Sequence, residues 1–263
     1  WPTMVTITSV EDYTKECFSK EDALTKFLVP YVYAKDLDLH AEKFLKKYCP
    51  RALETPMPLP IKEVLEAMCL TVYPAPLPDG IFGRTYFNSA TVDIYKDRNS
   101  DEIISAEIEK GTILVSPDSF FMRNIGCTHN TIIHECVHWD RHRKAFELER
   151  LYNRDATQIK CLVIGGSKGS SDRTAADWME WQANSLAPRI QMPIGSFKTK
   201  AAEYVRKFQR EMNATHIVDV MEAVIDALAT FFVVSRHAAK MRMVDAGYEE
   251  AIGAFTYIDG HYV

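Results

Sequence analysis

The segment 131–139 constrains the fold of this chain more than any other, because it contains the pattern His-Glu-x-x-His in a run that predicts a helix. Residues four apart on a helix lie one turn above each other on the same face. His134 and His138 can therefore direct two imidazole nitrogens at one point about 2.0–2.1 Å from each, as a tetrahedral zinc ion requires. Glu135 lies at the rim of that face, where its carboxylate can reach a water molecule at an open metal position. The pattern predicts a Zn²⁺ site with Glu135 as the catalytic base.

The alternative interpretation is a chance pattern in which both histidines are satisfied by ordinary contacts in a core. The apolar neighbours of the motif are Ile132, Ile133, Cys136 and Val137. Burying two histidines and a glutamate among such side chains would cost free energy without a strong partner. A metal ion is such a partner, so the metal site is the better interpretation.

Two histidines leave a catalytic zinc ion one protein ligand short. His142 is the nearest candidate, but on a straight helix it lies one turn beyond His138 and would have to reach back past it. We expect His142 to lie at the surface, or to contact a metal ligand without binding the metal itself. The better candidate is Glu180 in a second predicted helix over 177–187, where Asn184 lies on the same face and could hydrogen-bond a metal ligand. The alternative for Glu180 is an ordinary capping or surface glutamate.

The segments 130–138 and 180–193 together resemble the ImmA/IrrE family of metallo-endopeptidases. That family has HExxH followed by a helix reading Glu-x-x-Ala-Asn-x-Phe/Leu-Ala that ends near Met-Pro. The matching residues here are Glu180, Ala183, Asn184, Leu186, Ala187 and Met192-Pro193. Because the family's glutamate is the third zinc ligand, the resemblance implies that role for Glu180.

The resemblance covers roughly residues 58–195, with 59–87 similar to the family's opening helix and strand and 111–117 similar to the strand before the active-site helix. It implies an α+β fold. In that fold, a zincin-like domain with a small mixed or antiparallel sheet packed on the HExxH helix is flanked by N- and C-terminal helical segments. It also implies a zinc-dependent endopeptidase whose target is an intracellular protein, such as a transcriptional repressor of a mobile element or stress regulon.

The chain departs from the family pattern at two positions. Val137 stands where the family usually has a small residue, often glycine. Pro188 lies inside the second helix, where it removes a backbone donor and is expected to kink or end the helix. Between the two motifs, the Gly/Ser-rich run 165–171 predicts a loop, and a loop over 164–172 could gate the site.

Composition places the chain among ordinary soluble globular proteins, since 47% of its 263 residues are apolar and 25% are charged. A net charge of −5 gives no general attraction to nucleic acid or to an anionic membrane. The six cysteines are scattered without a Cys-x-x-Cys pair, as expected for free thiols in a reducing compartment. We recognise no signal peptide, and the longest apolar run, 227–234, is too short to span a membrane. We therefore expect a cytoplasmic protein that makes no membrane contact. We also expect sequence missing at both ends, because residue 1 is not methionine and the last residues, 255–263, stop on a predicted hairpin.

Three regions are predicted along the chain: an N-terminal helical extension (1–57), a zincin metallopeptidase domain (58–195) and a C-terminal helical region (196–263). The extension is expected to contain helices over 19–29 and 36–48, and the proline-rich segment 50–60 marks its end. The domain is expected to open with a helix from residue 61, a turn over 74–80, and strands over 86–95 and 112–115.

The C-terminal region predicts helices over 201–212 and within 218–247, and the latter segment is similar to a helix-turn-helix. Its turn has Val233 where glycine is common, although the left-handed conformation of glycine is what lets such a turn close tightly. Residues 196–248 include 8 basic and 6 acidic side chains, a balance of only +2. We therefore expect a packing or partner-docking bundle, with DNA binding unfavoured, and a hairpin over 255–263.

Two functions remain open at this stage: a zinc endopeptidase, or a regulatory or DNA-associated protein with a structural metal site and no proteolysis. Three protein ligands with an open position favour catalysis, whereas four favour a structural site. Cys136 is the candidate fourth ligand, but it points about 200° round the helix from His134, so we expect it to pack. The sequence determines neither the oligomeric state, nor the substrate, nor the residue that stabilises the oxyanion. The candidates for that residue are His129, Tyr204, His216 and His237.

Overall fold

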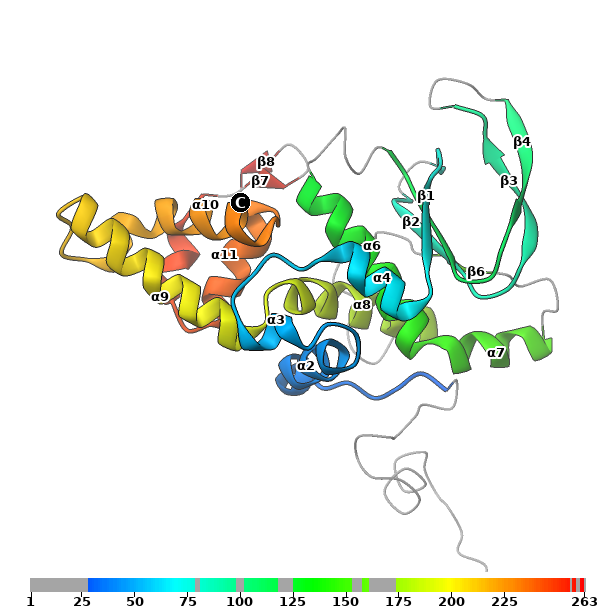
Figure 1. Cartoon of the computed structure of the whole chain (residues 1–263), viewed down its shortest axis with the longest axis horizontal. Coiled ribbons are helices and arrows are strands. Elements are labelled where there is room, and N and C mark those ends of the chain that lie inside the picture. The colour runs from blue at the N-terminus through cyan, green and yellow to red at the C-terminus, as the bar shows by residue number, and fades with distance from the viewer. Residues whose placement is uncertain are drawn as a thin grey trace, which may run out of the picture.

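Two helices at the centre of the molecule, α6 (Ile125–Arg141) and α8 (Ala175–Gln191), pack against each other and carry the motif residues (Figure 1). The computed structural model describes residues 28–78, 81–97, 102–117, 125–152, 158–160, 174–255, 257–258 and 261–262. The loop expected over 164–172 lies outside the described residues, as does all of the helix expected over 19–29 except its last two residues.

The start of α8 follows directly from its sequence. The backbone N–H of Asp177 donates to Thr174 Oγ1 (3.1 Å), and the backbone N–H of Thr174 donates to the Asp177 carboxylate (2.9 Å). This reciprocal capping box satisfies donors that the first turn of a helix otherwise leaves without partners. The other helices are α2 (Leu37–Tyr48), α3 (Arg51–Glu54), α4 (Ile61–Met68), α7 (Arg143–Tyr152), α9 (Ile194–Glu211), α10 (Met221–Phe232) and α11 (Arg236–Asp245). Short 3₁₀ helices are η1 (Ala34–Asp36), η3 (Ile217–Val220) and η4 (Glu249–Gly253).

A small mixed sheet packs on α6 through its two inner strands. Its strands lie in the order β1 (Thr71–Pro74), β5 (Thr112–Val115), β2 (Gly83–Tyr86) and β6 (Gln158–Lys160). Strand β1 runs parallel to β5, whereas β2 runs antiparallel to β5 and β6. Because side chains alternate along a strand, Ile113 and Val115 enter the core shared with α6, while Leu114 packs on the opposite face. An α+β architecture with a small sheet and flanking helices is thus confirmed.

The single strand expected over 86–95 is wrong. Strand β2 ends at Tyr86, and β3 (Ala90–Tyr95) begins after a bend at Phe87. The ring of Phe87 is buried and stacks on Trp139 and Phe146, so the chain turns inward there and cannot continue straight. Strand β3 pairs with β4 (Ile103–Ile108) in an antiparallel ribbon that extends away from the body of the molecule (Figure 1).

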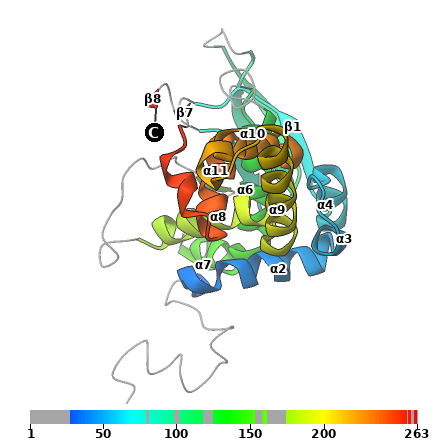
Figure 2. The same cartoon turned by 90° about the vertical axis from the view of Figure 1, so that its left-hand side faces the viewer.

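Two hydrophobic clusters form the larger cores. The first joins buried residues between Val32 and Ile190, including those of α2, α4, β5, α6 and α8. The described part of the N-terminal extension therefore shares this core with residues of the region 58–195, and Figure 2 shows α2 running along the underside of the molecule beneath α8. The second cluster lies between Met192 and Ala254 and joins α9, α10 and α11. The domain limits at 57/58 and 195/196 stay predictions.

From the sequence we expected α8 to kink or end at Pro188; it does not end there but continues to Gln191. Proline removes only its own donor, and the next turn is restored because the Met192 N–H donates to the Pro188 carbonyl at 3.0 Å. The neighbouring Ala187 and Ile190 are buried in the first core, and this packing stabilises the last turn of α8.

The C-terminal helices contact the start of α6 through a close backbone approach. A Cβ placed on Gly126 would lie 2.6 Å from the carbonyl carbon of Val234 and 2.9 Å from the Ser235 nitrogen. Only glycine fits there, so the turn between α10 and α11 rests on α6. The expected terminal hairpin is confirmed by β7 (Tyr257–Ile258) and β8 (His261–Tyr262). In the described part of the chain, no helix combines the length and the apolar character needed to cross a membrane.

Candidate metal centre

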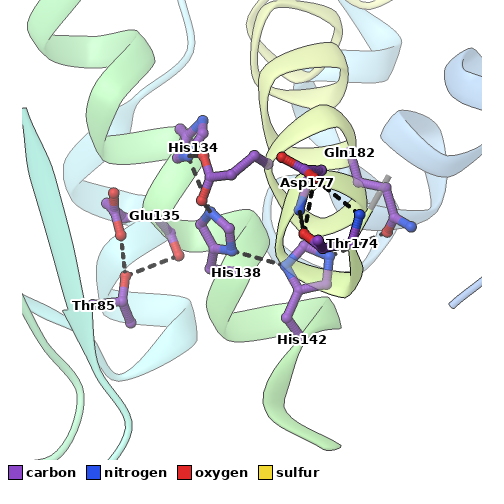
Figure 3. Close-up of polar contacts among 9 residues, drawn as sticks. Thr85, His134, Glu135, His138, His142, Thr174, Asp177 and Gln182 are labelled. Carbon is purple, nitrogen blue, oxygen red and sulfur yellow. Dashed lines mark hydrogen bonds and ion pairs between the residues drawn. The ribbon is translucent and has the colours of Figure 1, made fainter. Parts of the chain in front are cut away.

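Helices α6 and α8 bring His134, His138 and Glu180 together in the interior. Figure 3 shows the two histidines one turn apart on α6. The Nε2 atoms of the two histidines lie 3.0 Å apart. Glu180 places Oε2 3.3 Å from His134 Nε2 and Oε1 3.4 Å from His138 Nε2. All three side chains are buried, and the donor atoms of the group lie within 4.8 Å of one another.

This geometry fits a metal ion. Ligand atoms about 2.0–2.1 Å from a tetrahedral zinc ion lie roughly 3.3 Å apart, close to the three separations in this cluster. Oε1 of Glu180 is buried and makes no hydrogen bond with the described residues, so one oxygen lacks the partner that a cation would provide. Two imidazoles and a carboxylate also form a donor set that suits zinc. The group could therefore hold a metal ion.

The described residues supply three ligands and no fourth. The cluster contains only His134, His138 and Glu180 from the residues that the structure describes. Cys136 is fully buried in the first hydrophobic core, as expected from its angle on the helix, and burial raises the pKa of its thiol. A metal held here would keep a position open for another molecule.

The charges of the cluster favour a cation at its centre. Burial alone would raise the pKa of Glu180, but its polar contacts with His134 and His138 lower it to about 2. Burial alone would lower the pKa of His134, whereas the contact with Glu180 and the nearby charge of Glu135 raise it above its ordinary value. A side-chain hydrogen bond with Asn184 acts in the same direction. The carboxylates therefore stabilise positive charge between α6 and α8.

Glu135 is positioned from the other side by strand β2. Thr85 Oγ1 donates to Glu135 Oε2 at 2.6 Å, while Oε1 has no hydrogen-bond partner among the described residues. Gly83 makes room for that carboxylate, since a Cβ at this position would lie 2.6 Å from Oε1. Sequence reasoning missed both Thr85 and Gly83. The only signal in the sequence was a glycine inside a strand, which often marks a close approach.

His142 is buried against His138 and is not at the surface. Helix α6 ends at Arg141 and the chain bends at His142, so the straight helix assumed from the sequence is wrong. The buried His142 ring places Nδ1 2.9 Å from Nδ1 of His138 and Nε2 3.1 Å from Oε1 of Gln182. Burial, followed by the charge of His138, lowers the pKa of His142 well below its ordinary value. His142 does not join the metal cluster, as expected.

The cluster opens into a cleft of about 400 Å³ between α6, α8 and α11. The metal side of the cleft is lined by His134, Glu135, Glu180 and Asn184. The opposite wall is lined by Ser235, His237, Ala238 and Met241 of the C-terminal helices. Of the four candidates for oxyanion stabilisation, only His237 lines this cleft. The helix-turn-helix-like segment is thus a wall of the site.

Comparison with family models and with curated proteins finds no match to this sequence. The functional assignment therefore depends on the two motifs and on the geometry that brings them together.

Proposed function

We propose that this chain is a zinc-dependent endopeptidase of the ImmA/IrrE family, with a zincin-like fold around α6. It acts in the cytoplasm on a protein substrate such as a transcriptional repressor. The observation that carries the proposal is the buried cluster of His134, His138 and Glu180 beside Glu135 at the wall of a cleft. Catalytic zinc sites in peptidases use the same donor set, with an open position for the reacting molecule.

His134, His138 and Glu180 would hold the ion, which would supply Lewis-acid polarisation of the scissile carbonyl. Glu135 accepts the proton that the attacking water loses, and then delivers it to the departing amine. The Thr85 hydroxyl donates a hydrogen bond to Oε2 of Glu135, so Oε1 is the oxygen that is free to accept the proton. Asn184 orients His134 through their side-chain hydrogen bond.

The alternative function, a DNA-associated protein with a structural metal, fits the geometry less well. A structural zinc site is closed by four ligands, and the described residues provide three beside a cleft. Helix α11 turns Ala238 and Met241 toward that cleft, and a recognition helix would instead present such residues to a DNA groove.

The substitution Glu135→Gln tests the proposal. It removes the base but no ligand, so the variant should retain zinc and lose at least a hundredfold in cleavage rate, since general-base catalysis contributes about 10²–10⁴-fold. Glu66→Gln is the matched control, because that carboxylate is exposed on α4. Metal content is measured by elemental analysis, and cleavage is measured by mass spectrometry.

Repressors encoded beside the gene are the first substrates to test, by co-expression with the wild-type chain and with the Glu135→Gln variant. Cleavage products that appear only with the wild type would support the proposal. Equal cleavage by the Gln variant would show that Glu135 is not the base. Zinc binding without cleavage of any protein by either form would favour the structural alternative.

A further inference from the structure

A chain of hydrogen bonds runs from His138 away from the metal cluster, through α8, to the N-terminal segment. Nδ1 of His138 lies 2.9 Å from Nδ1 of His142, and Nε2 of His142 lies 3.1 Å from Oε1 of Gln182. The Gln182 amide then donates from Nε2 to the Pro30 carbonyl at 2.6 Å. His138 and His142 are 0% exposed and Gln182 is 2% exposed, so the two bonds of His142 are shielded from water, whereas the bond to Pro30 is partly buried. Figure 3 shows the His138, His142 and Gln182 side chains one after another along these hydrogen bonds.

The Pro30 carbonyl sets the direction of every bond in this chain. A carbonyl oxygen only accepts, so it faces the NH₂ group of Gln182 and turns Oε1 of that amide toward His142. Oε1 also only accepts, so the proton of a neutral His142 ring must be on Nε2. Nδ1 of His142 is then an acceptor.

The same logic continues to the metal ligand. Because Nδ1 of His142 accepts, Nδ1 of His138 must carry the hydrogen that it donates. The lone pair of a neutral His138 is then on Nε2, the atom that lies 3.0 Å from His134 Nε2 and 3.4 Å from Glu180. Imidazole binds a metal only through such a lone pair.

We propose that Pro30, Gln182 and His142 form a relay that holds His138 in the Nδ1-protonated tautomer and aligns Nε2 with the metal position. Gln182 and His142 are positioning residues, because they act on the metal position only through His138. A carboxylate or a backbone carbonyl commonly accepts directly from a ligand histidine. Here an uncharged relay connects the histidine to a backbone carbonyl, so it orients the ring without adding negative charge. The inference rests on the proposed metal site.

Two substitutions of Gln182 separate positioning from packing. Gln182→Leu fills the space but removes the acceptor, so Zn²⁺ affinity should fall about 10–100-fold. Gln182→Glu keeps an acceptor for His142 but places a carboxylate against the Pro30 carbonyl. It should therefore retain affinity within a few-fold of wild type while lowering the melting temperature. A merely structural role would make affinity follow stability in both variants.

Gln191→Leu is the matched control, because Gln191 is equally buried on α8 and bonds Asn130 rather than His142. Its Zn²⁺ affinity should remain within about threefold of wild type. Affinity is measured by competition with a chromophoric chelator, and Co²⁺ absorption reports the coordination geometry. Wild-type affinity in Gln182→Leu, or equal losses in Gln182→Leu and Gln191→Leu, would overturn the relay.

The tautomer can be read without metal or substrate. In the metal-free protein, ¹⁵N NMR of the imidazole rings should show the His138 hydrogen on Nδ1, and Gln182→Leu should populate the other tautomer. A His138 hydrogen on Nε2 in the wild type would contradict the relay. If the wild type bound no zinc, the proposed function would fail, while this spectrum would still decide the relay.

Discussion

Gly83 sets the position of the Glu135 carboxylate, which we propose as the catalytic base. Its missing side chain leaves space for Oε1 of Glu135, and Thr85 holds the second oxygen of that carboxylate. The two contacts come from one strand and act on one residue. The proposed base is therefore positioned by β2, whereas the proposed metal ligands lie on α6 and α8.

We predict that Gly83→Ala lowers activity with little change in zinc binding. The added Cβ would meet Oε1 of Glu135 at 2.6 Å and Cγ2 of Thr131 at 2.9 Å, so the carboxylate must move. A displacement of about 1 Å can cost about a hundredfold in rate. The control is Gly195→Ala, where a Cβ meets nothing within 4 Å and should only stabilise α9. Equal cleavage rates for the two alanine variants would contradict this role.

Metal content should rank the residues around the ion. Glu180→Ala leaves two imidazoles and should lose most bound zinc, while Asn184→Ala should cost about 10–100-fold in affinity. From the sequence alone, His142→Ala would be the mildest of the three. Because His142 is buried against His138, we now expect a loss comparable with that of Asn184→Ala. Elemental analysis of the three purified variants measures the order. Full zinc occupancy in Glu180→Ala, together with loss of zinc from His142→Ala, would show that His142 and not Glu180 is the third ligand.

At the scale of elements, the turn between α10 and α11 is closed by a strained residue. Val233 has φ 54°, in the left-handed region that a β-branched residue rarely adopts. Ser235 then caps α11 by accepting from the Ala238 N–H at 3.1 Å. The turn forms without glycine because Phe232 and Val234 on either side are buried in the core. Packing therefore overrides the local preference.

We predict that the free energy of unfolding of Val233→Gly is about 1 kcal/mol higher than that of Val233→Ala. Both variants lose the same packing, but only glycine relieves the positive φ. In the interior of α10, Ala229→Gly should show the opposite sign and lose about 1 kcal/mol relative to alanine. Urea denaturation of the three variants gives these values. A Gly variant less stable than the Ala variant would show that the left-handed conformation is not costly.

At the scale of the whole molecule, helices of both cores line the cleft beside the candidate metal centre. An ion pair connects helices of the two cores. Arg242 of α11 is buried, donates from Nε to the Met192 carbonyl at 2.9 Å, and pairs with Asp38 of α2. Gly126 brings α6 against the α10–α11 turn. The C-terminal helices should therefore unfold together with the helices that carry the metal ligands.

We predict that Zn²⁺ stabilises both cores in one transition. At free zinc a hundred times the dissociation constant, the gain is about 2.7 kcal/mol, or roughly 5–10 °C in melting temperature for a chain of this size. The variant His134→Ala should show no such shift. Calorimetry with and without chelator measures the effect. A second transition that does not respond to zinc would mean that the C-terminal helices unfold independently.

The sequence by itself determined those features whose partners are close in the chain. His134 and His138 share a helix face because they are four residues apart, and Glu180 and Asn184 share another for the same reason. The capping residues at Thr174 likewise set where α8 begins. The two shared faces depend on helix geometry alone, so spacing predicted them, although the helix was expected to begin at residue 177 and not at Ala175.

Only the tertiary structure decided which distant residues complete the site. Thr85 reaches Glu135 across 50 residues of chain, Gln182 reaches His142 across 40, and Pro30 reaches Gln182 across 152. The same is true of Phe87, whose stacking on α6 and α7 ends β2. Such pairs arise when packing closes long loops, and the free energy of closing a loop depends on its length and not on which residues meet. Local periodicity, together with the family resemblance, therefore predicted the residues of the metal cluster, whereas the groups that orient them followed from how the sheet, α8 and the N-terminal segment pack around α6.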